Sequence, residues 1–448
     1  MRGRLFKYWN RIRSGFWFIP ATMAGAAVAL AFLSVAVDKP LTEWLALSLG
    51  LNFTGGAEGA SAVLGIIAGS MITIAGVVFS MTLVALSLAS SQLGPRLLRT
   101  FMRDSTTQVV LGTFIATFLY CLLVLRTIRR AEEVSFVPHL SVTLGVLLAV
   151  ASVGVLIYFI HHVSVSIQAN EIAARIGQQL LGRLETLFPD QIGAGAPKVQ
   201  TEPHDSSFLE AFDRDSSAVR ADGDGYLQFI DGAALLALAV EEDIVVRLER
   251  KPGNFVVANC PLALIWPKSR ATDKITDQVR SLFVLGNQRT SDQDIEFGVN
   301  QLVEIAVRAL SPGLNDPFTA MMCVDHLGSV LCRLAARDTP SPHRYDHQNQ
   351  LRVIAPANTF PEVMDAAFNQ VRQYSRTSVA VTLRLLETIA VVAGFARRPG
   401  DLAALRQHAE MIGRGAMDAL SEREDRRAVE ERCQAAIQSC SEAAASCR

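Results

Sequence analysis

Residues 59–95 read GASAVLGIIAGSMITIAGVVFSMTLVALSLASSQLGP, and no charged side chain lies between Glu58 and Arg96. An uncharged stretch of this length is long enough to cross a bilayer as a helix with some tilt. The sequence therefore predicts an integral membrane protein.

Small and hydroxylated residues recur in this stretch at spacings of three, four or seven, which places them along one face of a helix. Such a face lets a second helix approach closely, or it lines a narrow aqueous path. Helix packing is the commoner of these two roles, and the sequence alone leaves both open. The face, called the small-residue stripe below, consists of Gly65, Gly69, Thr73, Gly76, Ser80, Ser87 and Ser91.

Three more uncharged runs accompany the one at 60–93, and they predict membrane spans at about 16–37, 109–125 and 140–160. A turn at Asp38-Lys39-Pro40 is expected to end the first span, with a short interfacial helix at 41–51. Basic residues are concentrated in segment 1–15 and in the loop after residue 95, and they favour the cytoplasmic side of a membrane. We expect a transmembrane domain at 16–160 with four helices and both termini in the cytoplasm.

The remainder of the chain has the mixed polarity of a cytoplasmic α+β domain. Apolar residues at helical spacing predict a continuous stem at 161–188, and the composition of 189–223 is typical of a linker. Alternating β-branched and aromatic runs predict a small β-rich module at 224–267. Residues 268–448 are predicted to be helical, apart from a short strand at 351–355. The fold class is thus an α-helical polytopic membrane protein with a cytoplasmic α+β domain.

Composition argues against several classes of function. The net charge is −1, which gives no electrostatic basis for binding nucleic acid. The seven cysteines form no C-x-x-C pair, so no zinc site is indicated. Phosphate-binding glycine loops and G-x-S-x-G elbows are missing from the sequence. We therefore expect no cofactor, no metal and no enzymatic activity.

Two basic groups flank the predicted spans. Arg96, Arg99 and Arg103 share one helical face and are expected either to anchor lipid headgroups or to form a positive rim at a pore mouth. His161 and His162 lie at the end of the fourth span. Interfacial histidines usually bond to local polar groups, and a pH-sensitive collar is the alternative.

The densest group of polar residues in the second half of the chain surrounds a predicted helix–turn–helix. Helix caps and a turn explain these residues, and a metal or substrate site is the less favoured alternative. Their spacing matches neither H-E-x-x-H nor a calcium-binding loop. They are Asp292, Asp294, Glu296, Asn315, Asp316, Asp325 and His326.

Segments 78–104, 108–127 and 294–320, the last containing ALSPGLNDP, resemble the bacterial predicted membrane proteins grouped as domain of unknown function 2254. This resemblance covers nearly the whole chain and implies a bacterial plasma (inner) membrane location, but it implies no activity. The phrase RLERKPGNFVVANCPLALIW at 247–266 resembles hairpins of barrel-sandwich hybrid domains such as lipoyl carriers. The carrier lysine is missing from the expected turn, so no attached cofactor is implied.

These patterns favour an oligomeric channel or transporter for an ion or small solute, regulated by the cytoplasmic domain. Its expected partners are the lipid bilayer and further copies of the chain. No ionisable residue lies in the middle of a predicted span, which favours passive conduction. The alternative is a membrane-anchored sensor or scaffold that binds a cytoplasmic partner.

Overall fold

The computed structural model describes residues 17–48, 56–94, 104–131, 134–166, 168–187, 206–356 and 358–446. The chain divides into two compact units, Met1–Glu171 and Ile172–Arg448. Each unit has its own core and is described by itself.

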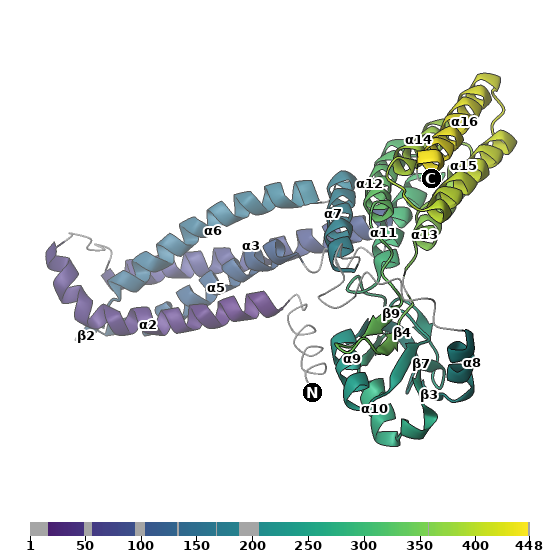
Figure 1. Ribbon diagram of the computed structural model, residues 1–448. Helices are drawn as coiled ribbons and strands as arrows, with labels where there is room; N and C mark the ends of the chain where they lie inside the picture. Colours follow the sequence, from purple (N-terminus) through teal and green to yellow (C-terminus); the bar gives the residue numbers. More distant parts are fainter. Residues whose placement is uncertain are drawn as a thin grey trace. The chain divides into compact units, whose positions relative to one another are not determined.

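The first unit is a bundle of long apolar helices, with a small hairpin of two strands, β1 and β2, before the last helix (Figure 1). Helix α5 packs against each of the other three, and its buried residues include Phe114, Tyr120 and Val124. The elements are α2 (Phe18–Ser48), α3 (Gly56–Leu93), α5 (Ser105–Thr127), β1 (Arg129–Ala131), β2 (Val134–Phe136) and α6 (His139–Ser166).

Three of these helices agree closely with predicted spans, because uncharged runs determine where a helix can lie in a membrane. The first helix differs: α2 continues through Asp38-Lys39-Pro40 to Ser48, so the predicted turn and the separate helix at 41–51 are wrong. A proline removes one helical hydrogen bond without forcing every helix to end.

Five helices within the described residues are long and apolar enough to cross a membrane. They are Phe18–Asp38, Gly56–Leu88, Ser105–Thr127, His139–Val165 and Pro317–Ala335. The fifth was not among the predicted spans, and the count of four therefore stays a prediction.

The predicted stem at 161–188 is not one helix. Helix α6 ends at Ser166, and α7 (Ala169–Leu187) begins after Gln168, whose N–H bonds to the Val165 carbonyl. Between these helices the sequence changes from uniformly apolar to amphipathic.

The second unit contains two small sheets that share one apolar core with α9 and α10. In the five-stranded sheet the order is β3-β7-β5-β10-β9, and in the three-stranded sheet it is β6-β4-β8. The elements are α8 (Ser206–Arg214), β3 (Ser217–Arg220), β4 (Gly225–Ile230), α9 (Gly232–Glu241), β5 (Val245–Leu248), β6 (Phe255–Val256), β7 (Pro261–Trp266), η2 (Lys268–Arg270), α10 (Asp273–Ser281), β8 (Phe283–Gly286), β9 (His343–Tyr345) and β10 (Leu351–Ile354).

Strands therefore extend beyond the predicted module at 224–267, and β10 corresponds to the short strand predicted at 351–355. Strand β10 pairs in parallel with β5, with Val353 opposite Val246, although more than 100 residues separate them. Residues 189–223 are not only a linker, because they contain α8 and β3; Phe208 of α8 packs edge-on against Trp266.

Six helices complete the second unit: α11 (Ile295–Ala309), α12 (Pro317–Ala335), α13 (Phe360–Tyr374), α14 (Val379–Ala393), α15 (Pro399–Ala419) and α16 (Arg423–Ser446). Helix α12 packs against α11, α13 and α14. Asp294 caps α11 and Asp316 caps α12, so two members of the polar group listed above serve as the helix caps expected there.

Candidate functional site

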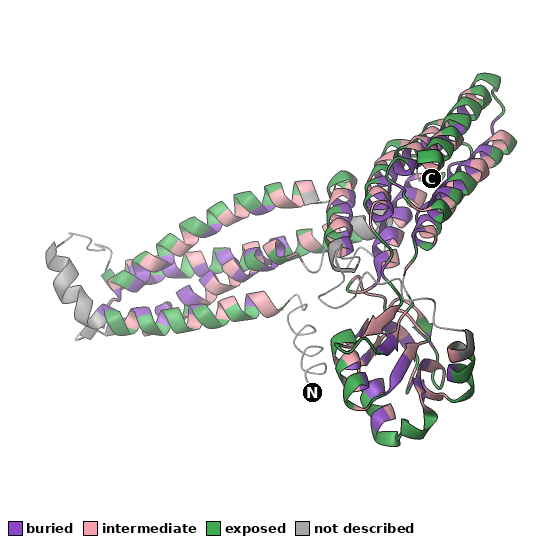
Figure 2. Cartoon of the chain, viewed as in Figure 1, coloured by how far each residue is buried: buried purple, intermediate pink, exposed green. Residues whose placement is uncertain are grey.

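Helix α3 has one buried face and one exposed face. Leu64, Met71 and Val78 are buried and belong to the apolar clusters that join α3 to α5 and α6. The outward faces of the helices in this unit are largely exposed (Figure 2). The position of the small-residue stripe relative to these two faces decides what it can contact.

The described members of the stripe all lie on the exposed face. An added Cβ at Gly65, Gly69 or Gly76 would meet no heavy atom within 4 Å. The stripe therefore does not pack against the other described helices of the first unit. Exposed members are Gly65, Gly69, Thr73, Gly76, Ser80 and Ser87, and the side chain of Ser91 lies outside the described residues.

The hydroxyl groups on this face differ in their hydrogen bonding. Thr73 Oγ1 donates to the Gly69 carbonyl at 2.8 Å. Ser80 and Ser87 form no hydrogen bond with any residue that the structure describes. A shallow hollow of about 460 Å³ follows the same face, lined by Gly65, Ile66, Gly69, Ser70, Thr73 and Ile74. Polar atoms and open space thus coincide on the outer surface of α3.

Of the two predicted histidines, one lies in a defined polar contact. His162 Nε2 lies 2.6 Å from Asp104 Oδ2, and its ring stacks on Tyr158. Asp104 also caps α5, accepting from Thr106 N and Thr107 Oγ1. Burial opposes ionisation of Asp104, but these hydrogen bonds and the histidine outweigh it, so the pKa of Asp104 is below its ordinary value. His161 is exposed.

A buried polar cluster at the other end of α6 was not predicted from the sequence. Asp38 of α2 is 1% exposed and accepts hydrogen bonds from Leu140 N, Ser141 N and Ser141 Oγ. Tyr120 Oη lies 3.0 Å from Ser34 Oγ and donates to the Ser141 carbonyl. A carboxylate from one helix therefore caps another, a contact that spacing along the sequence cannot reveal.

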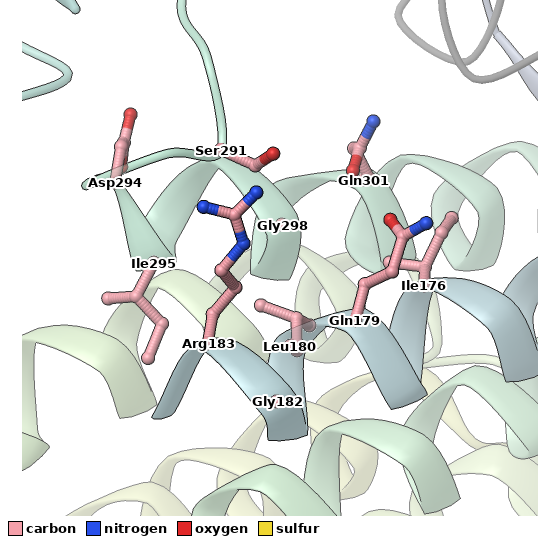
Figure 3. Close-up of a pocket in the computed structure, with 10 residues that line it drawn as sticks. All are labelled: Ile176, Gln179, Leu180, Gly182, Arg183, Ser291, Asp294, Ile295, Gly298 and Gln301. Carbon is pink, nitrogen blue, oxygen red and sulfur yellow. The ribbon is translucent and has the colours of Figure 1, made fainter. Parts of the chain in front are cut away.

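A pocket of about 330 Å³ lies between α7 and α11 in the second unit (Figure 3). Ile176, Leu180 and Ile295 give it an apolar floor, and Gly298 lets Leu180 approach. Arg183, held by the carbonyl and carboxylate of Asp292, lies at its rim.

Gln301 is the most informative residue of this pocket. Its side chain is 7% exposed and forms no hydrogen bond with any other described residue, so a bound molecule could bond to its amide. The pocket can hold a small polar molecule. Its lining includes the Ser291 hydroxyl and the Asp294 carboxylate, and the latter accepts bonds from Arg289 and Phe297 N.

The predicted polar group in this unit is divided among several structural contacts. Arg289 forms two bonds to Asp294, at 2.7 and 2.8 Å, and the Lys251 amine lies 3.5 Å from Glu296. Asp325 accepts two bonds from Arg384. Asp316 caps α12, His326 packs against Gly177, Asp292 binds Arg183, and Asn315 occupies the turn with a φ of 46°.

No three metal-binding side chains gather anywhere in the described part of the chain. The basic face predicted at Arg96, Arg99 and Arg103 lies outside the described residues, so both interpretations of it stay predictions.

The comparisons place these features in a family. Residues 13–391 match the family described as "Predicted membrane protein (DUF2254)". The chain belongs to this family. Uncharacterized proteins of Mycobacterium bovis and Mycobacterium tuberculosis are each 32% identical to it over 421 residues, which is 93% of this chain and 78% of the relative. No solved structure matches the chain. Membership of the DUF2254 family identifies the chain as a predicted membrane protein, and the family description names no activity.

Proposed function

We propose that this protein is a homo-oligomeric channel for an ion or small solute, in which the small-residue stripes of several copies surround a shared path. One observation carries the proposal: the stripe is exposed on the outside of its own bundle, with the Ser80 and Ser87 hydroxyls unbonded by the described residues. Hydroxyl groups that face hydrocarbon gain no hydrogen bonds, whereas water or a second helix supplies them.

The chemistry of α3 supports passive conduction. No charged side chain lies between Glu58 and Arg96, so a path lined by this helix offers hydroxyls and backbone but no strong binding site. Arg96, Arg99 and Arg103 would favour anions at one mouth of that path. We assign no catalytic residue.

The proposal includes a topology. We infer that four helices span a bacterial plasma membrane with both termini in the cytoplasm, because basic residues are concentrated before the first span and after the second, which lie on the same side of the membrane. Helix α12 is apolar because it packs against three other helices, so we count it as part of the second unit's core.

Flux measurements test this directly. Purified protein in liposomes is expected to release a trapped salt, and Gly76→Leu is expected to reduce the flux severalfold by filling the path. Gly154→Leu on α6 is the matched control, because both glycines are exposed and an added Cβ meets nothing at either site. The channel proposal would be overturned if liposomes with the wild-type protein showed no flux, or if the two variants conducted equally.

The pocket beside Gln301 favours a second candidate, a membrane-anchored sensor. In that case α3 would serve only for packing between copies, and a small molecule bound between α7 and α11 would be the signal. Gln301→Leu is then expected to abolish ligand-induced thermal stabilisation in a metabolite screen, while Gln348→Leu, an exposed site, leaves it intact.

A further inference from the structure

Two large apolar side chains, Leu314 and Phe318, are exposed to solvent at the turn between α11 and α12. Phe318 is 77% exposed, more than any other large apolar side chain in the described part of the chain, and Leu314 is 48% exposed. Two large apolar side chains exposed only four residues apart are a candidate surface for contact with something apolar.

This turn is held rigidly by its own hydrogen bonds. The N–H groups of Leu314 and Asn315 donate to the Ser311 carbonyl, and Asp316 N donates to the Ala309 carbonyl at 2.7 Å. Asp316 then caps α12 through Thr319. Leu314 and Phe318 are thus presented outward from an ordered backbone, which lowers the entropy lost when they bind.

Contacts with α7 show at which end of the second unit the turn lies. Arg183 bonds to Asp292 just before α11, while Leu180 packs against Gly298 farther along that helix, so α7 runs antiparallel to α11. Since α11 and α12 form a helical hairpin, α7 runs parallel to α12.

A contact between α7 and α12 shows how far along the unit Phe318 lies. Gly177 packs against His326. Phe318 precedes His326 by eight residues, about 12 Å along a helix, whereas Ile172, the first residue of the unit, precedes Gly177 by five, about 7.5 Å. Phe318 and its turn therefore lie at the end of the unit where the chain enters it.

The chain enters there directly from an apolar span. The candidate span His139–Val165 ends seven residues before Ile172, so this end of the second unit must stay close to a bilayer surface. We propose that Leu314 and Phe318 insert into the lipid headgroup and upper acyl region and form a membrane contact for the second unit. The inference holds whether or not the protein conducts.

Tryptophan fluorescence in the full-length protein tests it. Phe318→Trp and the control Phe395→Trp are each reconstituted into liposomes of phosphatidylcholine and phosphatidylglycerol. Asp325–Arg384 and Gly328–Thr388 contacts align α14 parallel to α12, which places Phe395, 50% exposed, at the opposite end of the unit. The four native tryptophans are common to both variants and cancel on subtraction of the wild type.

Lipids brominated near the headgroup are expected to quench the added Trp at position 318 much more than the one at 395, and acrylamide is expected to do the reverse. Leu314→Trp should repeat the result if Phe318→Trp folds poorly. Equal lipid quenching at 318 and 395 would overturn the inference. A residue 318 shielded from both quenchers would overturn it too, because a protein surface would then cover the turn.

Discussion

His408 shows how one buried side chain can make the second unit sensitive to pH. The residue is 2% exposed, its Nε2 lies 2.9 Å from Asp365 Oδ1, and its Nδ1 has no hydrogen-bond partner in the described residues. Burial lowers the pKa of His408, although Asp365 opposes this shift. Protonation would leave a buried Nδ1–H without an acceptor.

The unfolded chain binds a proton at His408 more readily than the folded one. Stability is therefore complete above the ordinary pKa of 6.5 and decreases as the pH falls below it, by about 1.4 kcal/mol for each unit that the pKa is lowered. Thermal unfolding followed from pH 8 to pH 5 measures this. We expect His408→Leu to flatten the profile, whereas the exposed His347 replaced by Gln should leave it unchanged.

Asp38 gives a second prediction at the scale of one residue. Asp38→Ala would leave the N–H groups of Leu140 and Ser141 unsatisfied at the start of α6, at a cost of about 1–3 kcal/mol. Denaturation in detergent measures the loss. Glu58→Ala removes the same charge from an exposed position, and an equal loss there would contradict the capping role.

At the scale of helices, close approach depends on glycine at particular sites. A Cβ at Gly328 of α12 would lie 2.4 Å from Thr388 Cγ2, and a β-branched side chain cannot easily move away. We expect Gly328→Ala to destabilise the second unit by about 1–3 kcal/mol.

Gly182 of α7 offers the matched control for this substitution. It is exposed with nothing within 4 Å of an added Cβ, so Gly182→Ala is expected to stabilise the helix by about 0.5–1 kcal/mol. Chemical denaturation of both variants would reveal opposite signs. Shifts of the same sign would contradict this account of the packing.

The elements that the sequence predicts well are those determined by local pattern. Uncharged runs predicted α3, α5 and α6, and helix caps were expected within the polar group that contains Asp294 and Asp316. Helix α8 was missed because it has only nine residues, and its role depends on Trp266 and Arg247, which lie far along the chain. The partner of β5 and the residue that caps α6 are likewise long-range contacts that no local spacing encodes.

The stripe was predicted as a candidate site, but its direction was not. Periodicity shows which residues share a face, and only the packing of α3 on α5 shows that this face points outward. The pocket beside Gln301 was missed altogether, because α7 and α11 contribute to it from segments more than 100 residues apart.

For the whole molecule, the proposed assembly predicts where copies meet. Ser80→Cys is expected to form disulfide-linked pairs of chains in the membrane under oxidising conditions, because the stripes of neighbouring copies would lie together. Gly154→Cys on the exposed face of α6 should not. Non-reducing electrophoresis distinguishes them, and crosslinking at position 154 alone would contradict the arrangement.

The parallel pairing of β5 with β10 has a consequence for synthesis of the protein. The five-stranded sheet lacks β10 and β9 until residue 354 has left the ribosome. By that time the α11–α12 hairpin has already emerged. A nascent chain must therefore hold the apolar edge of β5 unpaired while that hairpin is being made. A ribosome stalled before residue 343 should present a protease-sensitive second unit, and one stalled well after 354 a resistant one.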